Sequence, residues 1–334
     1  MLPIPRVAGQ PIPPLANGGG GRNRPHLAFH KPLEINGLCW EFRGHFSDLF
    51  SFHNEANFTT ICKRKMNQSK SKSRKDGSAD AYIDQRLAMG RVAFPLRDLV
   101  TETGLSVTAA RNQLLRLGNR ATRVSPRHQF FLIVSPEHRG VGAPPVAWWL
   151  DDYFHWLGQP YYLALQSAAS SFGSNPQALQ VTQVMTRIPR RFLEIGRIRV
   201  QFFVKRTLAQ TPTQPLANAF APVQVSTPEA TSYDLIRYAA RIGGIGRVAE
   251  TIAPLLPLMR PAELRRVLKI EDEPATAQRL GFVLEHLKAT HLAKVVQDWL
   301  PADLVLVPLV PGSRGDAPQI KRWRILNNAA EFGR

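Results

Sequence analysis

The clearest periodic pattern of apolar residues lies at the centre of the stretch 94–134. Ser106 begins it as a favourable helix N-cap, because its hydroxyl can accept a hydrogen bond from a free amide of the first turn. The residues that follow place one apolar stripe at helical spacing, which predicts an amphipathic helix that ends at Gly118. The stripe consists of Val107, Ala110, Leu114 and Leu117, and the opposite face carries Thr108, Arg111, Asn112, Leu115 and Arg116.

A shorter helix is expected before this one and a β-hairpin after it. Pro95 suits a first helical turn, and Gly104 suits the position that follows a last turn. Two short helices joined by a glycine turn, the second with cationic and amide side chains outward, predict a helix-turn-helix. The runs 121–124 and 130–134 predict a hairpin in the position of a wing. A helix at 81–90 would pack beneath them and complete a winged helix.

A winged helix implies DNA binding, with the second helix of the pair in the major groove. Thr108, Arg111 and Asn112 lie in the first turns of that helix on its outer face, so we expect them at base edges. The alternative is a small helical bundle whose basic face only keeps the protein in solution. The remaining predicted DNA-binding residues are Ser106 at the N-cap, Arg116, Arg123 and Arg127 as phosphate contacts, and His128 on the hairpin turn.

The charge of the chain favours the DNA-binding interpretation. Its 334 residues include 43 Lys+Arg and 25 Asp+Glu, a formal net charge of +18. A surplus of this size suits a polyanionic partner, either nucleic acid or an anionic membrane surface. Between Met66 and Ser135, 12 Lys+Arg against 5 Asp+Glu give +7. This concentration of charge around the predicted winged helix supports contacts with phosphates.

Residues 1–78 differ from the rest of the chain in composition. They begin with prolines and a run of glycines, which is typical of a linker, so we expect a disordered extension. A polar, basic segment begins at Met66 and resembles the tails that precede DNA-binding domains. We therefore expect Met66 to be the natural start and residues 1–65 to be upstream sequence.

The two cysteines of the chain predict neither disulfides nor a metal site. Cys39 and Cys62 have His45 and His53 between them, but the close Cys-x-x-Cys pair that favours zinc is missing. Two cysteines also fit a reducing cytoplasm. The N-terminus lacks a compact apolar region after a basic start, so we do not expect secretion. No apolar run approaches the length of a membrane span. We expect a cytoplasmic protein without metal or cofactor.

A second domain is expected after a proline- and glycine-rich connector at 136–145, which gives a DNA-binding domain at 79–135 and a C-terminal domain at 146–334. An aromatic helix at 146–157 would open that domain, and we interpret its aromatic face as packed core rather than a ligand-stacking surface. A second helix, rich in alanine and serine, is expected at 161–172.

Strands are expected at 180–186, 198–205 and 223–225. In the second of them apolar residues alternate with polar ones, which predicts one buried face and one wet, basic face. The basic face is a candidate binding surface for RNA or an acidic protein, and a merely solvated strand edge is the alternative. Its outward residues would be Arg197, Arg199, Lys205 and Arg206.

Helices dominate the remainder of the predicted C-terminal domain. Ser226 and Glu229 have the spacing of a capping box, with Pro228 in the first turn of the helix that they would begin. The predicted fold class is α+β, with a disordered N-terminal extension, a winged helix-turn-helix and a mixed α/β C-terminal domain. Further helices are expected at 245–259, 261–269, 276–287 and 292–300, and strand-like segments at 304–310 and 323–326.

Three segments follow the predicted winged helix in an informative order. PYYLALQSAASSFG contains Tyr161-Tyr162 and Ala168-Ala169, RIRVQFFVKR ends the strand pair, and VSTPEATSYDLIRY contains Ser226-Thr227-Pro228-Glu229 followed by Asp234-Leu235. Over about residues 80–290 this order resembles the AbiEi family, the antitoxins of bacterial abortive-infection toxin–antitoxin systems that defend against phage.

The resemblance implies a division of functions between the two domains. The N-terminal domain would bind operator DNA and repress its own operon. The C-terminal domain would provide antitoxicity and support cooperative DNA binding, and the basic face of the strand at 198–205 is its candidate antitoxin surface. The partner implied is a nucleotidyltransferase-like toxin, which the family's antitoxins are thought to oppose without a tight complex.

No set of residues predicts catalysis. Gly173-Ser174 resembles the opening of a nucleotidyltransferase site, but such a site needs paired carboxylates, and the next acid, Glu194, is alone. Asp151 and Asp152 are adjacent, so on a helix they point in different directions. Asp234 and Arg237 have i,i+3 spacing, which predicts a salt bridge or a structural hydrogen bond rather than catalysis. We therefore expect a protein that is not an enzyme.

A one-component transcriptional regulator is the alternative function. In that interpretation the C-terminal domain senses a small molecule, and the aromatic helix lines the pocket. A neighbouring gene for a nucleotidyltransferase-like toxin would distinguish the antitoxin from the regulator.

Overall fold

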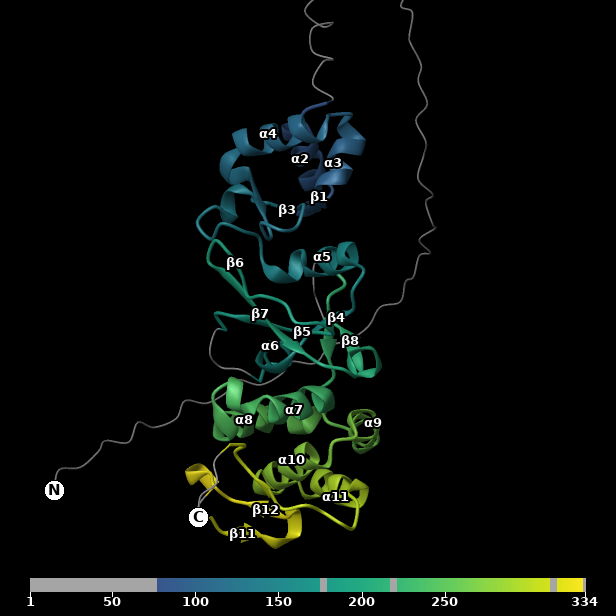
Figure 1. The fold of residues 1–334 in the computed structure, drawn as a ribbon, viewed down its shortest axis with the longest axis vertical. Coiled ribbons are helices and arrows are strands. Elements are labelled where there is room, and N and C mark those ends of the chain that lie inside the picture. The colour runs from purple at the N-terminus through teal and green to yellow at the C-terminus, as the bar shows by residue number, and fades with distance from the viewer. Residues whose placement is uncertain (1–76, 175–178, 217–220, 313–316, 333–334) are drawn as a thin grey trace, which may run out of the picture. The chain divides into compact units, whose positions relative to one another are not determined.

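The computed structural model describes residues 77–174, 179–216, 221–312 and 317–332 (Figure 1). The chain divides into a unit of residues 1–61 and a compact unit that begins at residue 62, and every described residue belongs to the second unit. The predicted extension, the start at Met66 and the question of zinc at Cys39, His45, His53 and Cys62 lie outside the described residues. No helix in the described ranges has the length and apolar character needed to cross a membrane.

The first described segment holds three helices and a three-stranded antiparallel sheet in the order helix, strand, helix, helix, hairpin. This is the element order of a winged helix-turn-helix. The strand order is β1-β3-β2, so the hairpin pairs with the strand between the first two helices. The elements are α2 (Ala79–Ala88), β1 (Ala93–Pro95), α3 (Leu96–Thr103), α4 (Val107–Arg116), β2 (Ala121–Arg123) and β3 (Phe130–Ile133).

Local sequence explains where these helices begin and end. Ser78 and Ser106 are the N-caps of α2 and α4, and their hydroxyls accept hydrogen bonds from the amides of Ala81 and Ala109. Gly104 ends α3 with φ of 69°, a conformation that glycine adopts without strain. Pro95 ends β1 and precedes α3, so it lies one residue before the predicted first turn.

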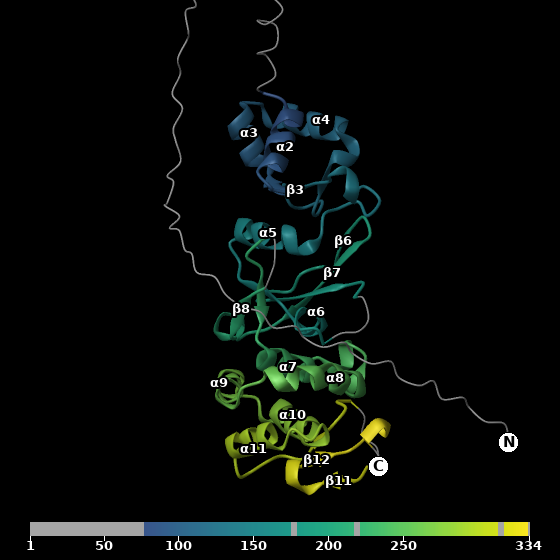
Figure 2. The ribbon, with the colours of Figure 1, turned by 180° about the vertical axis from the view of Figure 1, so that it is seen from behind.

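A six-stranded mixed sheet forms the centre of the C-terminal half, with strand order β6-β7-β5-β4-β9-β8. Figures 1 and 2 show α5 on one side of this sheet and α6, α7 and α8 on the other. The predicted α+β class is confirmed. The elements of this layer are α5 (Leu150–Leu157), β4 (Tyr161–Leu163), α6 (Leu165–Ser171), β5 (Thr182–Thr186), β6 (Leu193–Ile195), β7 (Ile198–Val204), β8 (Thr213–Pro215) and β9 (Gln224–Ser226).

The helix predicted at 161–172 begins four residues late, because Tyr161–Leu163 is a strand. This strand lies between β5 and β9 and pairs with both. Its side chains alternate between the two apolar clusters that cover the sheet, with Tyr162 in one and Tyr161 and Leu163 in the other. Pairing on both edges and burial on both faces outweigh the helical preference of the alanine-rich segment that follows.

The alternation predicted for 198–205 is correct only in its first half. Val200 and Phe202 pack in the cluster that contains α5, whereas Phe203 is fully buried in the cluster on the opposite face. Helices cover both faces of the sheet, so the strand has no continuous wet face. Arg199 and Val204 are exposed near the two ends of the strand.

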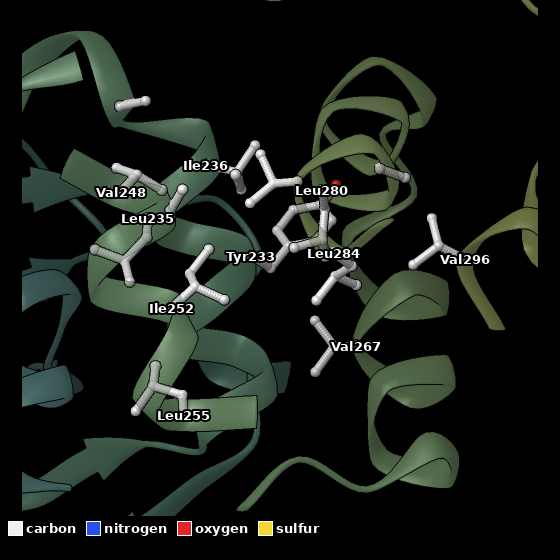
Figure 3. Close-up of a cluster of buried hydrophobic side chains, with 14 of the residues drawn as sticks. Tyr233, Leu235, Ile236, Val248, Ile252, Leu255, Val267, Leu280, Leu284 and Val296 are labelled. Atoms are coloured by element: carbon white, nitrogen blue, oxygen red, sulfur yellow. The ribbon is translucent and has the colours of Figure 1, made fainter. Parts of the chain in front are cut away.

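Five helices and a small three-stranded sheet complete the described chain. Helix α7 is their centre, and every residue from Pro228 to Ile236 is buried. In Figure 3, Tyr233 and Ile236 point toward Leu280, whereas Leu235 points toward Val248. The elements are α7 (Pro228–Arg237), α8 (Gly244–Ile252), α9 (Pro261–Glu271), α10 (Pro274–His286), α11 (Thr290–Trp299), β10 (Val307–Pro308), β11 (Gln319–Ile320) and β12 (Ile325–Leu326).

The capping box predicted at Ser226 and Glu229 is wrong by one residue. Thr227 is the N-cap of α7, and its hydroxyl accepts a hydrogen bond from the amide of Ala230. Ser226 is the last residue of β9 and is completely buried. The Glu229 carboxylate accepts a hydrogen bond of 2.7 Å from the amide of Arg260, just before α9. Glu229 therefore joins two helices instead of closing its own.

Lys205, predicted to point outward, is buried, because two carboxylates hold its ammonium group. Its Nζ lies 2.7 Å from Oδ1 of Asp234 and 2.7 Å from Oε1 of Glu271, and none of the three side chains has exposed surface. The hydroxyl of Tyr162 donates a 2.9 Å hydrogen bond to the other oxygen of Asp234. The pKa of Asp234 is raised by burial, and the charge of Lys205 opposes that rise.

Arg237 extends this cluster toward the surface. It bonds Glu271 at 2.8 Å and Glu273 at 2.5 Å, so the predicted pair of Asp234 with Arg237 is wrong. Asp234 points to the sheet and Arg237 to the helices. We call Lys205, Asp234, Arg237, Glu271 and Glu273 the charged cluster.

The hairpin of β2 and β3 shares an apolar cluster with α5. Phe130 lies 5.4 Å from the ring centroid of Tyr153 and 5.4 Å from that of Trp156. His128, on the hairpin turn, lies 2.7 Å from the hydroxyl of Tyr153 through its Nδ1, and its ring meets Trp156 edge to face. The structure therefore gives His128 a packing role against α5, and its DNA contact stays a prediction.

The surroundings of His128 disfavour its charged form. Burial lowers the pKa of His128 below its ordinary value of 6.5, and the nearby positive charges of Arg190 and Arg127 lower it further.

The buried ion pairs of Lys205 predict that replacing this residue destabilises the fold. Lys205→Met leaves two buried carboxylates without their partner, so we expect a loss of about 3–5 kcal/mol in the free energy of unfolding. Arg206→Met is the matched control, because Arg206 is the exposed neighbour and its loss should change stability by about 0.5 kcal/mol or less. Urea unfolding measures the free energy of unfolding of each variant. Equal losses for the two variants would contradict the structural role of Lys205.

The depressed pKa of His128 predicts a pH dependence. Between its folded pKa and 6.5 the unfolded chain binds more protons at this residue, so stability should fall as the pH drops through 6.5 toward the folded pKa. His128→Gln should flatten this part of the stability profile, whereas His155→Gln, at an exposed position of α5, should leave it unchanged. Thermal unfolding across this range is the measurement. If the stability of His128→Gln changed with pH as steeply as that of the wild type, His128 would not be the source of this pH dependence.

Candidate nucleic-acid interface

Helix α4 is held rigidly on its inner side. Ala110 and Leu114 are buried in the cluster formed with α2, α3 and the hairpin. The side-chain oxygen of Gln113 accepts a hydrogen bond of 2.7 Å from the amide of Ala79, which ties α4 to the start of α2. These contacts fix which face of α4 points outward.

The outer face of α4 contains the residues that the sequence assigns to base edges. Val107, predicted in the apolar stripe, is 46% exposed, because only the middle of the helix reaches the core. Leu115 is 78% exposed and adds an apolar contact to the same face. The exposed residues include Ser106, Thr108, Arg111, Asn112 and Arg116.

The arginines of this segment differ in whether their charge is compensated. Arg120 binds the carboxylates of both Asp80 and Asp84, so its charge is neutralised locally. Arg111 and Arg116 form no ion pair with any residue of the described ranges. An exposed guanidinium without a carboxylate partner is available to a phosphate or a guanine.

Two further guanidinium groups lie on the hairpin. Arg123 is exposed, its guanidinium lies 5.4 Å above the ring of Phe131, and it donates to the carbonyl of Pro126 at 3.3 Å. Arg127 is exposed on the turn. Both predicted phosphate contacts of the hairpin are therefore exposed, whereas His128 on the same turn faces α5.

The segment predicted as a connector, 136–145, packs against the sheet. The amide of Arg197 donates a 2.7 Å hydrogen bond to the carbonyl of Val141. Gly196, with φ of 58°, lies so close that an added Cβ would come within 2.1 Å of that carbonyl oxygen. Glycine at 196 therefore permits this contact between the connector and the β6–β7 turn.

The predicted antitoxin surface is divided. Arg197, Arg199 and Arg206 are exposed, but Lys205 belongs to the charged cluster. Arg199 lies 3.4 Å from Glu194, which partly neutralises it. Arg197 and Arg206 flank the seven residues of β7, so they lie about 20 Å or more apart at the usual rise of a strand.

Sequence reasoning missed a second cationic segment beside the hairpin. The loop 187–192 carries Arg187, Arg190 and Arg191, and it faces the hairpin turn across a cavity of about 630 Å³. The dense arginines of RIPRRF were the available signal, but only the fold brings them near Arg127. Within the described ranges no group of three or more His, Cys, Asp and Glu side chains forms a metal site.

Comparisons with known proteins agree with this architecture. The Rv2827c protein from Mycobacterium tuberculosis has a crystal structure with TM-score 0.57 and 14% identity, covering 74% of this chain and 90% of that one. At this identity the likeness concerns the fold alone. A nucleotidyltransferase-like protein from Paracoccidioides brasiliensis reaches TM-score 0.31 at 13% identity over 45% of this chain and 90% of its own, too little for a shared fold.

The family comparison concerns the sheet and the helices below it. No curated protein matches the chain. The profile of the AbiEi antitoxin C-terminal domain matches residues 162–286, from β4 to the end of α10. Residues 162–286 of the chain therefore carry an AbiEi antitoxin C-terminal domain, in agreement with the resemblance that the sequence shows.

Proposed function

We propose that this protein is the antitoxin of a bacterial abortive-infection system, that it represses its own operon, and that it neutralises a nucleotidyltransferase-like toxin. The observation that carries the proposal is the AbiEi antitoxin domain at 162–286, preceded by a helix-turn-helix with an uncovered cationic face. The proposed domains are a DNA-binding domain at 79–135 and an antitoxin domain at 146–334.

The DNA-binding half rests on the outer face of α4. Thr108, Arg111 and Asn112 occupy its first turns, where a recognition helix meets base edges. Arginine pairs bidentately with guanine and asparagine with adenine in the major groove. The phosphates beside these bases would be bound by Arg116, Arg123 and Arg127. The free amides at the N-terminus of α4, next to Ser106, suit a further phosphate. The shared core of hairpin and α5 would hold this surface rigid.

The antitoxin half acts without catalysis in this proposal. Asp234 and Glu271 have no exposed surface and are bound to Lys205, so they support the fold and are closed to a substrate. Asp151 accepts a hydrogen bond from the hydroxyl of Tyr161, which supports a structural role. The exposed Arg197, Arg199 and Arg206 are proposed as parts of the working surface.

Operator binding is tested by changing the outer face of α4. Arg111→Ala should cost about 1–3 kcal/mol of operator affinity and relax the sequence preference, because the arginine reads a base. Arg127→Ala should weaken binding to all DNA alike and flatten its salt dependence. Arg265→Ala, on the exposed side of α9, is the control for lost charge. Gel shifts with undiminished binding by an Arg111→Ala/Asn112→Ala double variant would refute the assignment.

Antitoxicity is tested by growth rescue in cells that express the toxin encoded beside this gene. The full chain is used, because a cut at residue 135 would expose the cluster that joins Phe130 to Tyr153. The Arg111→Ala/Asn112→Ala variant should rescue growth as well as the wild type when both are expressed from a foreign promoter, since rescue needs only the C-terminal domain. Failure of the wild type to rescue would favour the ligand-sensing regulator.

A further inference from the structure

The cavity beside the hairpin has no role in the proposed function. Its volume, about 630 Å³, lies in the usual range of small-molecule sites. The hairpin turn contributes Arg127 and His128, α5 contributes Tyr153, and the loop 188–192 forms the opposite wall. Three separate elements therefore converge on one concave space.

The lining of this cavity has uncompensated positive charge. Arg127, Arg190 and Arg191 face a single carboxylate, Glu194, which is paired with Arg199 at 3.4 Å. Two of these arginines, Arg190 and Arg127, lower the pKa of His128, after the larger effect of burial. Cations of one sign gathered around a concave space raise the local positive potential and favour an anion.

Arg190 uses only part of its hydrogen-bonding capacity. One of its terminal nitrogens donates to Gln159, and the guanidinium lies 5.3 Å above the ring of Phe154. Its Nε is buried and has no hydrogen-bond partner among the described residues. A buried donor left unbonded costs free energy.

The remaining wall of the cavity is apolar and partly open. Phe192 is 47% exposed and Ile188 is 45% exposed, and both line the cavity. A flat ring placed on Phe192 would cover this surface and gain stacking energy. Cationic and apolar walls in one cavity fit a ligand with a strongly charged end and a planar end.

We propose that this cavity binds a mononucleotide. A phosphate monoester carries nearly two negative charges, which three arginines match better than they match the single charge of a carboxylate. The phosphate would bind Arg191 and Arg127, and the base would lie against Phe192 and Ile188. The occupied cavity would engage Arg127, so the nucleotide and operator DNA would compete for this residue; only this consequence rests on the proposed function.

Isothermal titration calorimetry with the full chain tests the proposal. The probes are AMP, GMP, CMP and UMP, with inorganic phosphate and adenosine as the separate halves of the ligand. At least one nucleotide should bind at one site per chain and more tightly than either half. Arg191→Ala should weaken that binding about tenfold through loss of a charge-assisted hydrogen bond, and Phe192→Ala should weaken it severalfold.

Arg187→Ala is the matched control, because Arg187 is an exposed arginine of the same loop that does not line the cavity. Its nucleotide affinity should equal that of the wild type. Absence of binding by all four nucleotides at millimolar concentration would overturn the proposal, as would equal weakening by Arg187→Ala and Arg191→Ala. Operator affinity of the wild type without nucleotide tests the proposed function separately.

Discussion

The ion pairs of Lys205 are the constraint on which the C-terminal half depends. A cation without exposed surface is tolerable only where carboxylates lie at fixed distances, and here Asp234 comes from α7 and Glu271 from the end of α9. The ammonium group, just after β7, therefore fixes where both helices meet the sheet. Arg237 continues the chain of charges from α7 to Glu273, next to α10. An apolar contact tolerates a small shift in position, whereas this cluster does not.

A second constraint joins the helix-turn-helix to this scaffold. The hairpin and α5 bury one set of aromatic rings, and His128 meets the hydroxyl of Tyr153 at 2.7 Å. A residue that looks from the sequence like a cation for DNA therefore serves as a neutral packing group. The turn that carries Arg127 also forms one wall of the cavity, so any molecule bound there would touch both the hairpin and the loop 187–192.

The sequence predicted what local interactions determine. Helix α4, its cap at Ser106 and the glycine that ends α3 follow from neighbouring residues, and they lie where the pattern placed them. The strand Tyr161–Leu163 and the burial of Lys205 depend on partners far along the chain, so local preference gave a helix in one case and an outward side chain in the other. The cap of α7 was missed for a related reason, because Glu229 serves Arg260 instead of its own helix. Of the candidate site, the face of α4 was predictable, and the loop 187–192 was not.

Net charge alone is a weak guide to where this protein meets an anion, because its arginines do different things. Arg120 is neutralised by two carboxylates and Arg237 belongs to the charged cluster, so neither adds to an outward field. Arg111 and Arg116, on one exposed helix face, and Arg191, beside an exposed phenylalanine, form no ion pair with any of the described residues. Among the arginines without an ion pair, those of α4 lie on an exposed helix face, which the proposed function assigns to the groove of a duplex. Arg191 lines a cavity whose volume suits a small ligand.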